Sequence, residues 1–298
     1  MTAVHVAPLQ GWAGVVGRHP CFDELAHCRV GRVHLPVAPR CNIQCAFCER
    51  RVCASLTPQH PGCTRRVISA AEAVELVRRL AREQDGEPFV VGVAGPGEPL
   101  ANPATFEALG TIHREFPTLL KCLSSNGLLL EEKLPQILDA GVTAMTVTVN
   151  APDAEVGRGI YLWARRAGAV YRGQEAAELL VESQLRGIRA ALAAGLALKV
   201  NTVLIPGVND LHVARLARLL GELGVRLMNL MPLIPGGRMR DLRAPTCGEL
   251  LQARSICARW VPQFHLCQHC RADVVHFPAG WNHEEHEERQ RRQRIDNG

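Results

Sequence analysis

The chain has 298 residues, of which 47% are apolar, so it is long enough to bury a sizeable core in one α/β domain. Only 4% are aromatic and the formal net charge is +5, which leaves little material for stacking nucleic-acid bases. No apolar run is long enough to span a bilayer, and the N-terminus lacks a secretory signal. We therefore expect a cytoplasmic protein that binds neither nucleic acid nor membrane.

Short apolar runs alternate with helical patterns along most of the chain, which is typical of parallel βαβ units. The expected strands are 33–37, 88–94, 119–124, 143–149, 197–203 and 226–231. Capping residues at Ser69, Asn102 and Thr246 predict three helix starts, and further helices are expected at about 130–140, 176–195 and 210–223. The sequence therefore predicts the α/β class, as a partial, open (β/α)₆ barrel.

The barrel is expected to occupy residues 31–240, between an N-terminal arm (1–30) and a C-terminal extension (241–282). Residues 283–298 carry many charges and almost no apolar side chains, so we expect a solvated, disordered tail there.

Twelve cysteines in a chain without an export signal indicate metal or redox chemistry and not a disulfide framework. Cys41, Cys45 and Cys48 follow the first predicted strand with C-x₃-C-x₂-C spacing. A structural zinc ion is normally enclosed by four protein ligands, whereas three close thiolates suit three irons of a [4Fe–4S] cluster. This spacing, with Phe47 before the last cysteine, resembles the signature of the radical S-adenosylmethionine (SAM) superfamily, which implies that SAM binds the open iron.

Polar residues follow the next two predicted strands. Glu98 lies in a Gly-Pro-Gly-Glu-Pro loop, and Ser124 and Asn126 end the strand after it. Because barrel-type folds build their sites at the C-terminal ends of strands, we expect these three side chains beside the cysteine loop. An exposed loop carboxylate at Glu98, or a simple turn at Asn126, is the alternative.

A second pair of cysteines, Cys267 and Cys270, has C-x₂-C spacing near the end of the chain. Such a pair is half a zinc site, a redox pair or a pair of iron–sulfur ligands, and the first motif favours the last of these.

Several segments together resemble the NifB family of nitrogenase cofactor maturases, over about residues 17–278. These segments are His19-Pro20-Cys21, Arg32-Val33-His34 and residues 38–45, 95–103, 122–127, 201–210, 229–233 and 267–273. The resemblance implies that two [4Fe–4S] clusters are fused into an eight-iron cluster with a central carbide. One SAM would methylate a cluster sulfide, and a radical made from a second SAM would take hydrogen from that methyl group.

The resemblance also implies roles for particular residues. Glu98 would meet the SAM ammonium group, and Ser124 and Asn126 the carboxylate or ribose. The two substrate clusters would be held by a mixed shell drawn from Cys21, His34, Cys53, Cys122, Cys267 and Cys270. Which cysteine holds which cluster stays open, as do His19 and His27 as substitutes for His34 and Cys63 as a competitor of Cys53.

The implied partners are proteins that donate iron–sulfur clusters, an electron donor such as ferredoxin or flavodoxin, and a carrier that accepts the product. We expect the chain to correspond to the short form of the family, which lacks a carrier-like C-terminal domain. Two other classes remain open: another radical SAM enzyme with auxiliary clusters, such as a peptide maturase, and a non-enzymatic iron–sulfur or zinc scaffold.

Overall fold

The computed structural model of the protein describes residues 11–50, 52, 61–84, 87–267 and 269–278. The candidate ligand Cys53 and the predicted tail 283–298 lie outside these residues. Within the described part, no helix is long and apolar enough to cross a membrane.

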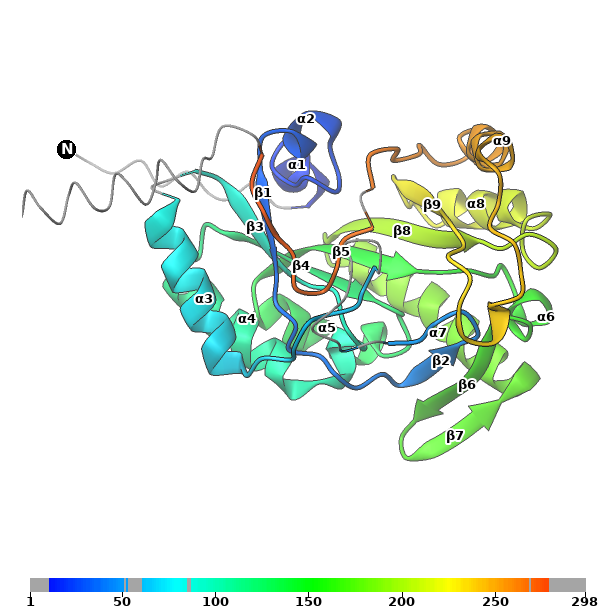
Figure 1. The fold of residues 1–298 in the computed structure, drawn as a ribbon, viewed down its shortest axis with the longest axis horizontal. Coiled ribbons are helices and arrows are strands. Elements are labelled where there is room, and N and C mark those ends of the chain that lie inside the picture. Colours follow the sequence, from blue (N-terminus) through cyan, green and yellow to red (C-terminus); the bar gives the residue numbers. More distant parts are fainter. Residues whose placement is uncertain (1–10, 51, 53–60, 85–86, 268, 279–298) are drawn as a thin grey trace, which may run out of the picture.

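A seven-stranded sheet forms the body of the molecule, with the order β10-β1-β3-β4-β5-β8-β9 (Figure 1). Six of its strands are parallel, and β10 pairs antiparallel with β1 at one edge. The bounds are β1 Gly31–His34, β3 Phe89–Val93, β4 Leu120–Ser125, β5 Val142–Thr148, β8 Ala197–Leu204, β9 Met228–Pro232 and β10 Val275–His276. The partial barrel is confirmed, and all six of its parallel strands begin within two residues of their predicted starts.

The first strand was predicted too late in the chain: β1 spans Gly31–His34 and not 33–37. Pro36 has no N–H to donate to a neighbouring strand, so the ladder ends before it although the apolar run continues. Leu35 N still donates to Gly92 O at 2.9 Å, but Val37 N donates to Leu35 O within its own segment and not to the neighbouring strand.

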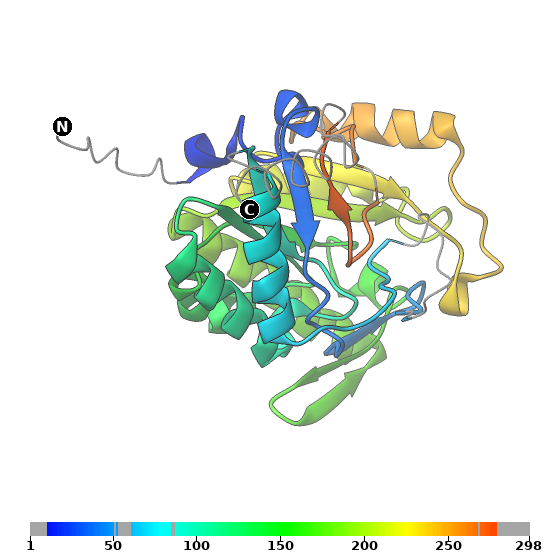
Figure 2. The same ribbon diagram turned by 60° about the vertical axis from the view of Figure 1, so that its left-hand side comes forward.

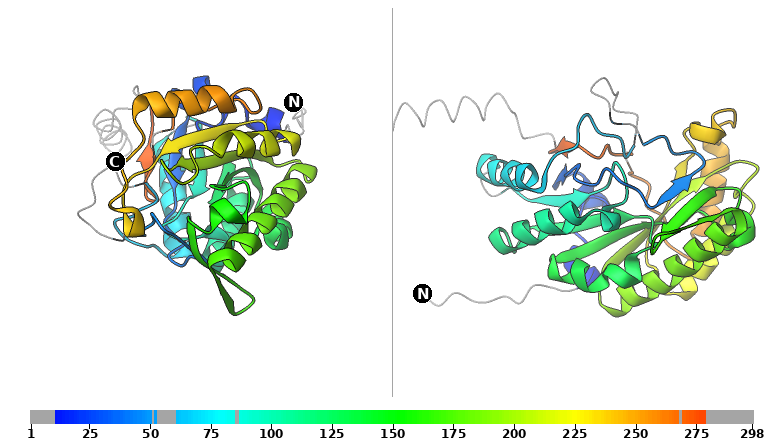
Figure 3. Two further views of the ribbon diagram at one scale, coloured as in Figure 1. Left: turned by 90° about the vertical axis from the view of Figure 1, so that its right-hand side faces the viewer. Right: turned by 90° about the horizontal axis from the view of Figure 1, so that it is seen from below.

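Helices cover one side of the curled sheet, and the segment that contains β2 lies on the other side (Figure 3). Buried side chains of these helices pack with Val91, Leu123, Met145 and Val200 of the strands to form the main core. The helices are α3 Ala70–Glu83, α4 Pro103–Glu115, α5 Leu130–Asp139, α7 Gly173–Ala193, α8 Val213–Glu222 and α9 Cys247–Cys257. The capping boxes predicted at Ser69 and Thr246 are both present.

A second, three-stranded sheet was not predicted. It consists of β2 Ile43–Cys45, β6 Tyr161–Arg166 and β7 Ala169–Arg172, so β2 runs through the cysteine motif itself. The β6–β7 hairpin turns at Ala167 and Gly168, whose φ angles of 49° and 82° match a two-residue hairpin turn. This sheet and the short helix α6, Ala154–Gly157, border a second apolar core that includes Ile43, Ala164 and Leu180.

Both ends of the described chain fold back onto the barrel. The N-terminal arm forms the short helices α1 Trp12–Val15 and α2 Glu24–His27. Figure 2 shows β10 beside β1, and His34 N donates to Val274 O at 2.8 Å. The extension therefore reaches both edges of the sheet, since Phe264 N donates to Met228 O of β9 at 2.8 Å.

The cysteine loop is fixed against the Gly-Pro-Gly-Glu-Pro loop by backbone pairing. Gly97 N donates to Ala38 O at 2.6 Å, and Glu98 N donates to Arg40 O at 2.8 Å. A Cβ on Gly97 would lie 2.3 Å from Arg40 O, so only glycine allows this approach. Glu98 directly precedes the 3₁₀ turn η1, Pro99–Ala101. A second 3₁₀ turn, η2 Gly237–Met239, contacts the cysteine loop, because Arg238 N donates to Ala46 O at 2.7 Å.

We expect Gly97→Ala to lower the free energy of unfolding by about 1–3 kcal/mol, because the new methyl group must push the Arg40 carbonyl away. The urea midpoint of the iron-free protein measures this change. Gly110→Ala is the matched control. A Cβ on Gly110 would lie 3.7 Å from its nearest neighbour, Arg114 Nη1. Gly110 lies in the interior of α4, where alanine is expected to raise the free energy of unfolding by about 1 kcal/mol. An unchanged midpoint for Gly97→Ala would contradict the close approach.

Candidate functional site

Glu98 is a buried carboxylate at the centre of the site, not an exposed loop residue. Its Oε1 accepts hydrogen bonds from Ser125 Oγ at 2.7 Å and Leu100 N at 3.1 Å, and its Oε2 accepts from Asn126 N at 2.6 Å. Burial raises the pKa of Glu98 to about 7, although these three donors act to lower it. A carboxylate has about four acceptor positions, so one stays open to a further donor.

Asn126 joins Glu98 to the cysteine loop. Its Nδ2 donates to Asn42 Oδ1 at 2.7 Å and lies 3.8 Å from Cys41 Sγ. Its Oδ1 accepts from Leu128 N at 3.0 Å, as expected of a turn residue. The structure therefore places Glu98, Asn126 and Cys41 in one group, as the sequence predicted.

Ser124 does not contact Glu98, whereas its neighbour Ser125 does. Successive side chains of a strand point to opposite sides, so Ser124 lies on the face of Cys122 and Ser125 on the other. Sequence reasoning missed Ser125 because both serines end the same apolar run.

Cys41, Cys45 and Cys48 are half-buried in the loop that contains β2. Burial raises the pKa of each thiol, to about 11 for Cys41, and the pKa of Cys45 is raised further by its two partners. Three such thiols ionise together only when a cation offsets their mutual repulsion. This donor set fits a bound iron cluster, whose irons supply that charge.

Asn102 was predicted to cap α4, and it does occupy the N-cap position before Pro103. Its side chain makes no capping bond, however. Instead Nδ2 donates to Arg40 O and to Glu98 O, both at 2.7 Å. The amide therefore ties the cysteine loop to the Glu98 loop.

A second group lies lower in the barrel, on the inner face of the sheet. His34, Gly92, Cys122, Ala144 and Ala197 occupy paired positions on five neighbouring strands. A Cβ on Gly92 would lie 2.7 Å from Cys122 Sγ and 3.4 Å from His34 Cδ2. The glycine therefore lets the thiol and the imidazole approach each other.

The predicted ligands Cys21, Cys122 and Cys267 pack against one small apolar cluster that includes Phe22, Ala144 and Phe264. Cys270 belongs to the same group, because the pKa of Cys122, raised first by burial, is raised further by Cys21 and Cys270. The arm, the sheet and the extension thus each supply at least one of these thiols.

Two of the candidate histidines differ in tautomer. His34 Nδ1 lies 2.9 Å from Arg271 O, so Nδ1 carries the proton and Nε2 keeps its lone pair. His19 Nδ1 accepts from Cys21 N at 3.1 Å, so its proton lies on Nε2, which is buried and without a partner among the described residues. Burial lowers the pKa of both rings, which are therefore neutral. A metal-bound histidine normally donates its other N–H to a carbonyl or carboxylate, which His34 does and His19 does not.

In the part of the chain that the structure describes, no three Cys, His, Asp or Glu side chains converge closely enough to enclose a single metal ion. A zinc ion would need four such ligands together, whereas each thiolate of an iron–sulfur cluster binds its own iron atom. Cys63 lies between the cysteine loop and the C-terminal extension. Its carbonyl accepts a hydrogen bond from Ala272 N at 2.8 Å, and its thiol helps to raise the pKa of Cys48.

Two further features of the strands and strand ends were not predicted from the sequence. Asn209 donates to Asn150 O at 2.9 Å and to Val203 O at 2.8 Å, which fixes the turn after β8. Lys199 lies buried on the inner face of β8. A polar side chain within an apolar strand, as at Lys199, or shortly after one, as at Asn209, was the feature of the sequence that could have indicated both.

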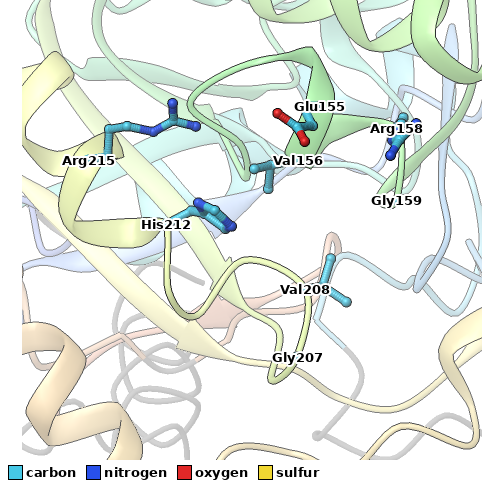
Figure 4. Close-up of a pocket in the computed structure, with 8 residues that line it drawn as sticks. All are labelled: Glu155, Val156, Arg158, Gly159, Gly207, Val208, His212 and Arg215. Carbon is cyan, nitrogen blue, oxygen red and sulfur yellow. The ribbon is translucent and has the colours of Figure 1, made fainter.

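A surface hollow of about 680 Å³ lies between α6 and the loop that joins β8 to α8 (Figure 4). Arg158, His212 and Arg215 line it together with Glu155. It contains none of the predicted site residues. A second hollow, of about 480 Å³, includes His34 with Arg65, Arg66 and Asp273.

The chain matches the family model described as the radical SAM superfamily over residues 35–220. Among solved structures, it superposes on SuiB of Streptococcus suis bound to S-adenosylmethionine with a TM-score of 0.57 and 9% identity, over 81% of this chain and 52% of that one. It superposes on methylornithine synthase with a TM-score of 0.53 and 16% identity, over 78% of this chain and 63% of that one. These structures share the fold, and the superfamily implies a [4Fe–4S] cluster and SAM as cofactors.

Curated relatives are considerably more similar. The FeMo cofactor biosynthesis protein NifB of Methanocaldococcus jannaschii is 44% identical over 264 residues, 89% of this chain and 87% of that protein. NifB of Methanocaldococcus infernus is 43% identical over 86% of this chain and 84% of its own length. The Klebsiella pneumoniae protein is 42% identical, and the match covers 86% of this chain but 56% of that protein. The chain therefore belongs to the NifB family of the radical SAM superfamily.

Proposed function

We propose that this enzyme fuses two [4Fe–4S] clusters and inserts a carbon atom derived from SAM, to form the eight-iron precursor of the nitrogenase cofactor. The observation that carries this proposal is the presence of two separate cysteine groups in one barrel. One group suits a SAM-binding cluster, and the other suits substrate clusters. Relatives named for FeMo cofactor biosynthesis, over most of the chain, support it.

Cys41, Cys45 and Cys48 would hold the SAM-binding cluster. When bound, this cluster supplies the electron that cleaves SAM. The open acceptor position of Glu98 suits an ammonium donor, and Asn126 extends from Glu98 to Cys41. Ser124 shares a strand face with Cys122, so we propose that it contacts SAM on the side of the substrate clusters.

The substrate clusters would be bound by Cys21, Cys122, Cys267, Cys270 and His34. Cys53 remains a proposed ligand that lies outside the described residues. His34 is preferred to His19 because its Nε2 is free of a proton. A neutral imidazole binds iron less tightly than a thiolate, which suits a ligand that must release iron as the clusters merge.

The reaction requires partners of three kinds. Protein donors would supply the [4Fe–4S] clusters, a ferredoxin or flavodoxin would supply electrons, and a carrier protein would accept the product. We expect these encounters in the cytoplasm.

The direct test of the proposed function uses SAM labelled with ¹³C in its methyl group. The reconstituted, reduced protein is expected to release 5′-deoxyadenosine and to transfer label into an eight-iron product. Cys41→Ala, Cys45→Ala and Cys48→Ala should each abolish 5′-deoxyadenosine formation while the chain stays folded, because each removes one of three cluster ligands. SAM cleavage without label in the cluster would instead favour another radical SAM reaction, such as peptide maturation.

Ser125→Ala should weaken the apo protein by about 1–3 kcal/mol, because it leaves a buried carboxylate oxygen short of one donor. Ser124→Ala, one residue away, removes a hydroxyl with no such contact and is expected to change stability by less than about 0.5 kcal/mol. Urea unfolding of the two iron-free variants makes the comparison. Equal losses would show that the Glu98 contact does not stabilise the fold.

The double variant Cys267→Ala, Cys270→Ala should bind about four fewer iron atoms after anaerobic reconstitution, because one [4Fe–4S] cluster loses its anchors. Spectra of the SAM-binding cluster should persist. Cys28 and Cys247 are both exposed, so their double alanine variant is the control and should keep its iron. An unchanged iron content in the first variant would exclude this pair as ligands.

A further inference from the structure

Lys199 is a buried lysine at the inner face of β8, with 3% of its surface exposed. Its Nζ donates to Cys21 O at 2.9 Å. The same ammonium group lies 5.0 Å from the centroid of Phe264 and 5.4 Å from that of Phe22. Within the described residues, no carboxylate forms an ion pair with it.

Burial of an ammonium group without a carboxylate is unfavourable unless other groups offset the lost hydration. One carbonyl and two aromatic rings supply part of that compensation, since ring faces attract cations. All three groups come from outside the barrel strands: Cys21 and Phe22 from the arm, and Phe264 from the extension. Lys199 therefore joins three segments that are distant in sequence.

The position of Lys199 relates it to the substrate-cluster thiols. Its carbonyl partner is Cys21 itself, and Phe22 and Phe264 belong to the apolar cluster against which Cys21, Cys122 and Cys267 pack. Its positive charge also acts to lower the pKa of Cys122 and Cys270, which burial raises. Arg32 acts in the same sense on Cys270.

We propose that Lys199 is a positioning residue that fixes Cys21 among the auxiliary thiols and supplies positive charge where their thiolates gather. The hydrogen bond to the Cys21 carbonyl holds the arm at the sheet, so that a thiol from a segment with little regular structure keeps a fixed place. The role of the charge rests on the proposed function, because it requires that these thiols bind iron–sulfur clusters. The positional role does not.

Lys121 provides a matched control. It is also buried on a parallel strand, β4, and its Nζ lies 3.4 Å from Phe116 O and 3.5 Å from Pro117 O. These carbonyls belong to the loop before its own strand and carry no candidate ligand. A general cost of removing a buried lysine should therefore affect both variants, whereas an effect on Cys21 is expected from Lys199 alone.

The first experiment measures alkylation of individual cysteines in the iron-free protein by mass spectrometry. In Lys199→Met, Cys21 should react about tenfold faster relative to exposed Cys28 of the same arm, because one hydrogen bond to a charged group is lost. Lys199→Arg, which keeps the charge and the donors, should restore most of the protection. Lys121→Met should leave the ratio unchanged. An unchanged ratio in Lys199→Met, or an equal rise in Lys121→Met, would overturn the positional role.

The second experiment measures iron after reconstitution. Lys199→Met and Lys199→Gln should each hold about four fewer iron atoms than the wild type, with the spectrum of the SAM-binding cluster retained, and Lys199→Arg should keep its iron. A full iron content in both neutral variants would overturn the role of the charge. If Cys21 is protected as described but the wild type itself binds no auxiliary cluster, the proposed function fails and the positional role stands.

Discussion

The site depends on the backbone contact between two loops at the C-terminal ends of β1 and β3. Ala38 and Arg40, directly before the cysteine motif, accept hydrogen bonds from Gly97 and Glu98. The missing side chain of Gly97 permits this approach, and the buried Glu98 carboxylate then collects donors from β4 and from the turn after it. A shift of either loop would separate Cys41 from Asn126, so the geometry of the candidate site follows from these two backbone hydrogen bonds.

The barrel interior contains two environments that differ in polarity. At the strand ends, Glu98, Asn126 and Asn42 form a continuous hydrogen-bonded group beside the first three cysteines. Lower in the barrel, small residues at Gly92, Ala144 and Ala197 leave room beside Cys122 and His34. The arm and the extension close this second region with thiols, aromatic rings and one lysine. The proposed cluster ligands of this region therefore depend on tertiary contacts, whereas the first three cysteines are neighbours in sequence.

The predictable part of the molecule is the part governed by local patterns. Buried parallel strands carry continuous apolar runs, so β3, β4, β5 and β8 were located from sequence, as were the helices that begin at Ser69 and Thr246. The small sheet was missed because β2 is only three residues long and Ile43 finds its partner at Ala164. Ser125 was missed because strand parity decides which of two adjacent serines meets Glu98. Lys199 was missed because its partners come from both ends of the chain.

The strand within the cysteine motif constrains when the motif can take its shape. Cys45 ends β2, which pairs with β6, and the Ala46 carbonyl is bound by Arg238 on η2. A nascent chain that has been synthesised only as far as Cys48 therefore contains the three cysteines but lacks β6 and η2, which hold the motif in place. Non-local pairing of this kind forms late, after the loop-closure entropy of the intervening chain has been overcome. We therefore expect iron to enter a barrel that is already folded, and not a chain that is still being synthesised.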